Sequence, residues 1–334
     1  ATLGYFKEQG VMVKIISGDN VSTVLNIADK VGLDDVKGID VGSLNDEELK
    51  EAVGQYEVFG RVTPNQKKVI IESLQQSGRT VAMTGDGVND VLALKKSDCA
   101  ISVASGSDAA RNVAQLVLLD DNFDSLPKIV AEGRRTINNI ERSASLLLVK
   151  TIYTMLLIIF SVLIASKYFF IPIQLTLITG FTIGIPSFIL ALEPNNDLVK
   201  GNFLLKVATR SLPTALTVVF NVVLVTCFAT LFELPYELQS TLCVYLTALT
   251  GFIYLYKICM PFTALRRALF CVMFAGFVYC ALFQYSFFSL TPLTLTSALI
   301  AFVLCIDSLY IYRRLNHFIT MLFAKLDPTI EVEY

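Results

Sequence analysis

The segment TGDGVND, residues 84–90, places the carboxylates of Asp86 and Asp90 four residues apart in a glycine-rich turn. Mostly apolar residues 80–83 before it predict a short buried strand, and residues 91–95 after it predict a helix. In an open α/β sheet, a turn from strand to helix lies at the carboxyl edge, where ligands bind. A hard cation such as Mg²⁺ prefers carboxylate and phosphate oxygens, so the segment favours a magnesium site over a solvated acidic turn.

A second predicted strand, residues 11–16, also ends in a polar turn, which consists of Ser17, Gly18 and Asp19. A helix is predicted directly after this turn, over residues 21–31, from apolar residues at helical spacing. The Ser17 hydroxyl is a donor of the kind that a phosphoryl-transfer site places on phosphate oxygens.

A lysine follows a third strand-to-helix turn. The segment RVTPNQK, residues 61–67, places Pro64 in the first turn of a predicted helix that carries Lys67. A hydroxyl, a lysine and paired carboxylates therefore follow three predicted strands in order. Phosphoryl transfer needs these parts, because donors and cations bind the phosphate oxygens while a carboxylate holds the metal.

These three segments resemble the haloacid-dehalogenase-like phosphorylation domain of P-type (E1-E2) cation-transporting ATPases. SGD at 17–19 is similar to the family's TGD, RVTPNQK matches its RVxPxxK, and TGDGVND matches its hinge motif residue for residue. The family usually continues with Ala-Pro, where this chain has Val91 and Leu92. The resemblance covers residues 1–143 and implies an α/β, Rossmann-type partial domain.

The same resemblance implies roles for individual residues. It implies that Ser17, Gly18, Asp19 and Lys67 contact the phosphate of an aspartyl-phosphate intermediate. Asp86 is implied to bind Mg²⁺, the expected cofactor, and Asn89 and Asp90 to position the site. ATP is the implied substrate, and its hydrolysis is coupled in this family to cation translocation.

The nucleophile of that family does not occur in this sequence. The family phosphorylates the Asp of a DKTGT segment upstream of the hydroxyl motif, and this chain has no such segment and begins with Ala1. We therefore expect the C-terminal portion of a pump, with its N-terminal part as a missing partner. A natural truncation, a clipped product and a split gene remain open, and the chain alone is not expected to pump.

Charge divides the chain into two regions. Residues 1–145 contain 16 Lys+Arg and 21 Asp+Glu, and the totals of 27 and 29 leave 11 and 8 for residues 146–334. The second region contains six apolar stretches close to the ~20 residues of a membrane helix. This predicts an all-α transmembrane bundle over 144–312, with spans at 146–165, 171–192, 213–232, 238–256, 268–285 and 293–312, and a tail at 313–334.

Lysines and arginines predict the orientation of these spans. They gather in the loops after the second and fourth spans and in the tail, whereas Lys167 stands alone on the opposite side. We therefore expect an integral protein of a plasma membrane, bacterial by resemblance, with the N-terminal domain and the tail in the cytosol. The lipid bilayer is an expected partner, and nothing in the sequence indicates nucleic acid.

A helix is predicted to continue without interruption from Asp124 into Leu146, since no Pro or Gly follows Gly133 in this stretch. Such a helix would leave the phosphotransfer domain and enter the bilayer. It is either a rigid lever or a simple tether, and the resemblance to the family's stalk helix favours the lever.

Polar residues inside the first two spans are the candidates for an ion path. The second span is broken by glycine and proline, which frees carbonyl oxygens for a cation. Threonines in membrane helices also pack or bind their own backbone, so both roles remain open. The candidates are Thr151, Thr154, Thr179 and Thr182.

The segment TIGIP, residues 182–186, resembles a bacterial P-type subgroup that imports calcium. Calcium pumps usually carry Asn or acidic residues where this chain has Thr151, Thr154, Thr179 and Ile183. The usual high-charge calcium site is therefore not intact. Calcium is the preferred cation because of the resemblance to the subgroup, and magnesium, manganese, a monovalent ion or a non-ion substrate stay open. The absence of Cys-x-x-Cys and Cys-Pro-Cys argues against a soft-metal pump.

Two other functions compete with the pump. A membrane-anchored haloacid-dehalogenase-like phosphatase fits poorly, because the nucleophile is missing and six spans exceed the needs of an anchor. A non-catalytic remnant or regulatory partner of a transporter has the same sequence features as the C-terminal part of a pump. The sequence alone does not separate this third function from the first.

Overall fold

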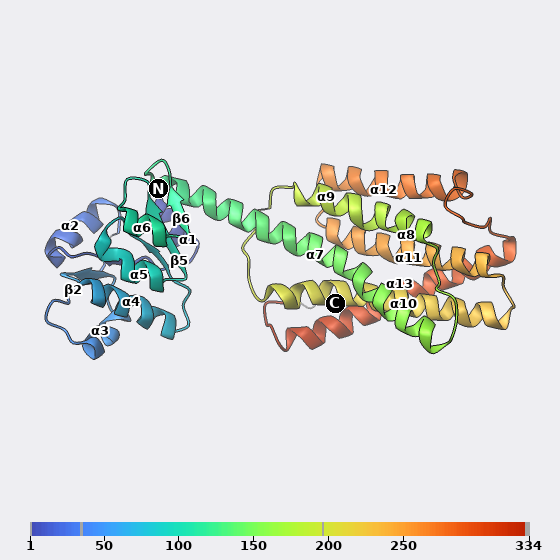
Figure 1. The fold of residues 1–334 in the computed structure, drawn as a ribbon, viewed down its shortest axis with the longest axis horizontal. Helices are drawn as coiled ribbons and strands as arrows, with labels where there is room; N and C mark the ends of the chain where they lie inside the picture. The colour runs from blue at the N-terminus through green and yellow to red at the C-terminus, as the bar shows by residue number, and fades with distance from the viewer. Residues whose placement is uncertain (1, 34–35, 196, 331–334) are drawn as a thin grey trace. The chain divides into compact units, whose positions relative to one another are not determined.

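The computed structural model describes residues 2–33, 36–195 and 197–330. Its contacts divide the chain into two compact units, Ala1–Ala131 and Glu132–Tyr334 (Figure 1). The first unit is a mixture of helices and short strands, and the second is helical throughout its regular elements.

The described residues of the first unit form two parallel sheets of three strands each. One sheet has the order β1-β3-β2 and the other has the order β4-β5-β6. The strands are β1 (Ile15–Ile16), β2 (Gly38–Asp40), β3 (Val58–Gly60), β4 (Ala82–Thr84), β5 (Cys99–Val103) and β6 (Leu116–Leu118).

Helices alternate with these strands, as parallel pairing requires. They are α1 (Thr2–Glu8), α2 (Val21–Lys30), α3 (Asp46–Val53), α4 (Pro64–Gln76), α5 (Val91–Lys96) and α6 (Asp108–Val113). Short 3₁₀ turns, η1 (Val88–Asp90) and η2 (Phe123–Ser125), precede α5 and the long helix that follows.

Helix α4 contributes to the cores beside both sheets. Its Ile70 packs with Leu49 and Phe59 in one apolar cluster, and its Ile71 packs with Met83 and Leu94 in the other. All six side chains are buried, so two neighbouring residues of α4 pack it against both halves of the unit.

The second unit contains six helical segments long and apolar enough to cross a membrane. They are α7 (Leu126–Leu163); α8 (Pro172–Thr179), η3 (Gly180–Gly184) and α9 (Ile185–Ala191) together; α10 (Phe203–Leu231); α11 (Tyr236–Cys259); α12 (Ala264–Phe283); and α13 (Leu295–Ala324). In the most apolar window of α11, 67% of residues are buried, against 28% in α7, α12 and α13, so α11 is central.

A polar network joins the core helices α10, α11 and α13. The Asn221 amide donates to Thr250 Oγ1 at 3.1 Å and to Ser308 Oγ at 2.9 Å. All three side chains are buried and satisfied, which fixes the register of the helices without an unpaired polar group.

The predicted arrangement is confirmed: an α/β unit with parallel strands is followed by six apolar helices. The continuous helix is also confirmed, since α7 runs without a break over 38 residues from Leu126. The predicted strand 11–16 is wrong in length, because only Ile15 and Ile16 pair with β3. The domain limits at residues 143 and 312 stay predictions.

Candidate functional site

The hinge turn TGDGVND begins where β4 ends. Gly85 donates its N–H to Ile101 O at 3.0 Å, and this bond fixes the turn to the neighbouring strand. A Cβ at Gly85 would lie 2.6 Å from the Cβ of Asp90, so only glycine lets Asp90 fold back over the turn. The N–H of Gly87 donates to Asp90 Oδ2 at 3.2 Å and holds the carboxylate there.

Lys67 and Asp90 form an ion pair at this turn. Lys67 Nζ lies 2.6 Å from Asp90 Oδ1, and both side chains are only 11% exposed. The pair joins α4, which follows the first sheet, to the turn that follows β4 in the second sheet. The two residues that sequence analysis placed 23 positions apart therefore meet in one site.

The position of Lys67 depends on the start of α4. Thr63 caps this helix by accepting the Gln66 N–H at 3.3 Å, and the Gln66 side chain accepts the Thr63 N–H at 3.0 Å. With Pro64 in the first turn, this capping box defines where the helix begins and where Lys67 lies along it.

The Ser17 turn is bound to the segment that leads into α4. Val62 donates its N–H to Ser17 O at 2.9 Å, and Arg61 donates to Asp19 O at 2.7 Å. The Ser17 hydroxyl accepts the Asp19 N–H at 3.1 Å, which closes the turn around Gly18. Backbone contacts therefore link the predicted hydroxyl to the helix that carries the predicted lysine.

Asp86 and Asn89 are exposed at the tip of the hinge turn. The Asp86 carbonyl accepts the Ser107 N–H at 2.7 Å, whereas its carboxylate has no hydrogen-bond or ion-pair partner among the described residues. A free carboxylate beside a buried Lys–Asp pair fits Mg²⁺, which takes one or two protein carboxylates and fills its shell with water and phosphate oxygens.

The start of β4 is held by another carboxylate. Asp98 accepts the Val81 N–H at 2.7 Å, just before Ala82 opens the strand. This hydrogen bond, with a further one from the Gln75 side chain, lowers the pKa of Asp98. The ionised carboxylate is therefore the form that keeps β4 in place.

A second candidate site lies inside the helix bundle. A small cavity of about 10 Å³, close to the space of one water molecule, lies between α7, η3, α10 and α11, and its lining is mostly apolar. Five of its eleven lining residues carry a hydroxyl group: Tyr153, Thr182, Thr214, Thr247 and Tyr254. Apart from Thr182, none of these hydroxyls has a hydrogen-bond partner in the described part of the chain.

Buried hydroxyls without partners are costly and need an explanation, such as a water molecule or an ion. Thr182 Oγ1 donates to Ile178 O at 2.7 Å, which leaves its oxygen lone pairs available. Thr182 packs closely against Gly251 of α11. A side chain at residue 251 would prevent this contact, because its Cβ would lie 2.9 Å from Thr182 Cβ. The hydroxyl groups of the residues around this mostly apolar cavity are therefore the candidate partners of a small polar guest.

The four predicted ion-path threonines are placed differently. Thr182 lines the cavity, whereas Thr154 and Thr179 have buried, unpartnered hydroxyls that do not line it. Thr151 is exposed on α7 and donates to Leu147 O of its own helix at 3.3 Å. Thr151 is thus not brought to the cavity.

Sequence analysis missed Thr214, Thr247 and Tyr254 as cavity residues. They lie in helices that the sequence marks only as apolar spans. The only indication in the sequence was a hydroxyl-bearing residue within an apolar stretch. Other threonines of α10 and α11 fit the same description, but their hydroxyls donate to the backbone of their own helix.

Comparison with known proteins matches the first unit to a hydrolase family and most of the chain to transport ATPases. The family model of haloacid dehalogenase-like hydrolases matches residues 1–98. The chain is 45% identical over 291 residues to the probable cation-transporting ATPase exp7 of Streptococcus pneumoniae, covering 84% of this chain and 37% of that protein. It is 48% identical over 229 residues to the calcium-transporting ATPase CtpE of Mycolicibacterium smegmatis, covering 65% and 29%.

A calcium-transporting ATPase of Bacillus subtilis is 35% identical over 201 residues, which cover 58% of this chain and 23% of that protein. The chain thus spans about a third, or less, of the length of each of these relatives. The fold and these matches together indicate a haloacid-dehalogenase-like domain followed by membrane helices of the P-type ATPase kind. The relatives that the chain resembles are named as cation-transporting or calcium-transporting ATPases.

Proposed function

We propose that this chain supplies the metal-binding half of the phosphorylation site and six membrane helices of an ATP-driven cation pump. The observation that supports this most is the Lys67–Asp90 pair at 2.6 Å beside the partner-free carboxylate of Asp86. A buried cation, fixed by one carboxylate next to a second that is free for a metal, suits a phosphate group with bound Mg²⁺.

In the proposed mechanism, the Ser17 hydroxyl and the Gly18 backbone N–H donate to the oxygens of the transferred phosphoryl group, and Asp19 closes the turn that presents them. Lys67 neutralises its charge, and Asp90 keeps the ammonium group in place. Asp86 and Asn89 hold and orient the metal-bearing side of the site. When bound, Mg²⁺ would stabilise the charge that develops on the phosphoryl oxygens.

The strand that bears the nucleophilic aspartate is proposed to come from a separate, N-terminal part of the pump. Among the described residues, β1 pairs only with β3, and β4 pairs only with β5. The Ser17 turn follows β1, and the Asp86 turn follows β4. A parallel strand added beside these two edges would end next to both turns.

Helix α7 is the proposed mechanical link to the membrane. Its 38 residues form one helix of about 57 Å at 1.5 Å per residue. An unbroken helix transmits displacement better than a jointed tether. This proposal places the phosphorylation unit and the tail on the cytosolic side of a plasma membrane, in agreement with the distribution of lysine and arginine.

The transported substrate is proposed to be a cation, with calcium or another divalent ion as the first candidate. The relatives CtpE and the Bacillus subtilis pump are both named calcium-transporting ATPases. The hydroxyl-bearing residues around the small cavity beside η3 are the proposed source of neutral oxygen ligands, which a hard cation accepts. A screen of Ca²⁺, Mg²⁺, Mn²⁺, Na⁺ and K⁺ for stimulation of ATP hydrolysis by the assembled pump tests this assignment.

Replacing Thr182 or Thr214 by valine is expected to raise the cation concentration for half-maximal ATPase stimulation about tenfold. Valine keeps the shape of threonine and removes one oxygen from the cavity. Thr151→Val is the matched control, because Thr151 is exposed and should leave the cation response unchanged. A response unaltered in all three variants would leave the cavity threonines as packing residues.

Gly251→Ala is expected to weaken the cation response more than either valine variant. The added methyl group would lie 2.9 Å from both Thr182 Cβ and Cγ2, so η3 must shift away from α11. Gly180→Ala is the control, since a Cβ there meets no atom within 4 Å. Equal cation titrations of the two alanine variants would contradict the placement of Thr182 in the site.

A further inference from the structure

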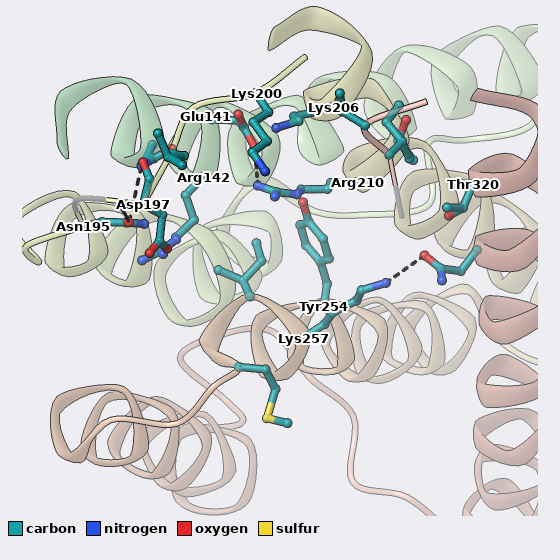
Figure 2. A pocket seen from close by; sticks show the side chains of 18 residues that line it. Glu141, Arg142, Asn195, Asp197, Lys200, Lys206, Arg210, Tyr254, Lys257 and Thr320 are labelled. Carbon is teal, nitrogen blue, oxygen red and sulfur yellow. Dashed lines mark hydrogen bonds and ion pairs between the residues drawn. The ribbon is translucent and has the colours of Figure 1, made fainter. Parts of the chain in front are cut away.

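A cavity of about 510 Å³ lies among the helix ends of the second unit (Figure 2). It is formed by the early part of α7, the start of α10, the end of α11, the later part of α13 and the connections near residues 195–200 and 329–330. Its volume is within the ordinary range for small-molecule sites. Tyr254 also lines the smaller cavity, but no other described residue in the lining of the larger cavity belongs to the smaller one or to the phosphotransfer site.

Cationic side chains dominate the described lining of this cavity. Two carboxylates, Glu141 and Asp197, oppose five cationic groups. The cationic residues are Arg142, Lys200, Lys206, Arg210 and Lys257. An excess of positive charge in a concave site attracts anions and concentrates them there.

Ion pairing within the protein leaves much of this charge uncompensated. Arg210 binds Glu141 at 2.7 Å, which accounts for one of the two lining carboxylates. Arg142 binds Glu193 at 3.0 Å, but Glu193 also binds Arg266 at 2.8 Å. One carboxylate therefore serves two arginines, and a positive charge remains at the edge of the cavity.

Two lysines are available for a ligand. Lys200 and Lys206 form no hydrogen bond or ion pair with the described residues, and Figure 2 shows both near Arg210. Lys206 interacts electrostatically with Asp327, but the carboxylate of Asp327 already has hydrogen-bond partners. It accepts the Asn202 N–H at 2.7 Å and the Thr329 hydroxyl at 2.7 Å.

A buried hydroxyl lies on the floor of the same cavity. Tyr254 is 2% exposed, and its hydroxyl has no hydrogen bond of good geometry within the described residues. Figure 2 shows this hydroxyl pointing toward Arg210. A polar group buried at this cost beside cations indicates a ligand that brings acceptor oxygens.

We propose that this cavity binds the phosphate group of an anionic phospholipid. Lysine and arginine with a hydroxyl donor form the usual set for phosphate oxygens, and basic pockets between membrane helices bind lipid headgroups. The lining also contains Leu198 and Met260, each 52% exposed, beside Ile258 and Ile330. Apolar side chains at the mouth suit the glycerol and acyl part of a lipid, which inorganic phosphate lacks.

The test measures phosphatidylglycerol retained by the detergent-purified chain, using native mass spectrometry. Phosphatidylcholine is the zwitterionic comparison, and inorganic phosphate is the competitor that lacks a lipid tail. The variant Lys200→Gln with Lys206→Gln removes two cavity charges without breaking an ion pair. The matched control, Arg313→Gln with Lys325→Gln, removes two charges on and beside α13 from residues outside the cavity lining.

We expect roughly a thirtyfold weaker affinity for phosphatidylglycerol in the cavity variant and little change in the control. Tyr254→Phe, which keeps the ring, should weaken retention severalfold. Equal losses in cavity variant and control, or equal retention of both lipids, would overturn the proposal. Competition by millimolar inorganic phosphate would overturn its lipid part. Because no step requires ATP, these outcomes are independent of the proposed pump activity.

Discussion

Asp86→Asn is expected to abolish Mg²⁺-dependent formation of the phosphoenzyme in the pump assembled from this chain and its nucleophile-bearing part. The Asp86 carboxylate has no partner among the described residues, so asparagine removes a charge without breaking a structural contact. Loss of the group that holds the metal should lower the rate of phosphorylation at least a hundredfold. Incorporation of labelled phosphate from ATP, titrated with Mg²⁺, measures this effect.

A second isosteric substitution controls for general damage to the domain. Asp108→Asn removes an exposed carboxylate that pairs with Arg111 within one turn of α6. Such a surface pair contributes little, so phosphorylation should stay close to that of the unchanged protein. Normal phosphoenzyme in the Asp86→Asn variant would refute the metal-binding role of this residue.

Lys67→Met is expected to destabilise the first unit as well as the site. Its ammonium group lies 2.6 Å from Asp90 Oδ1 with both side chains 11% exposed, so the substitution leaves a nearly buried carboxylate unpaired. Breaking such a pair costs on the order of 3 kcal/mol. Hydrogen exchange of the α4 and α5 amides in the whole chain should accelerate about a hundredfold.

The next residue of the same helix provides a matched control. Lys68 is 47% exposed and lies 3.7 Å from Glu72, so Lys68→Met should change exchange by less than about twofold. Adding Asp90→Asn to Lys67→Met removes the orphaned charge and should recover part of the loss. Equal exchange in the Lys67 and Lys68 variants would show that the pair contributes nothing to stability.

The phosphotransfer half of the protein was largely predictable from its sequence. The order of Ser17, Lys67 and Asp86 after three strands indicates a common edge of one sheet, whereas β1 and β3 lie in one three-stranded sheet and β4 lies in the other. The direct pairing of Lys67 with Asp90 was not predictable. It depends on the approach of α4 to the hinge turn, which buried contacts of Ile70 and Ile71 determine.

The membrane half was predictable in its number of apolar helices but not in its polar interior. Hydropathy identifies a span by its average and does not say which face of the helix turns inward. The sequence therefore made Thr151 and Thr182 equally good candidates for the ion path. In the structure, Thr151 is exposed, whereas Thr182 is 1% exposed inside the bundle. The cavity of about 510 Å³ with the cationic lining was not predictable from the sequence either. Its lining residues come from segments up to 192 residues apart, from Asn138 to Ile330.

The most direct test of the account is cation-dependent phosphorylation of the assembled pump. Labelled ATP should form an acid-stable, hydroxylamine-sensitive acyl phosphate whose level depends on one cation of the panel, with Ca²⁺ as the expected ion. The same cation should be transported across proteoliposome membranes when ATP is supplied, and Asp86→Asn should abolish both signals. A pump that forms no acyl phosphate, or whose phosphorylation ignores every cation, would contradict the account.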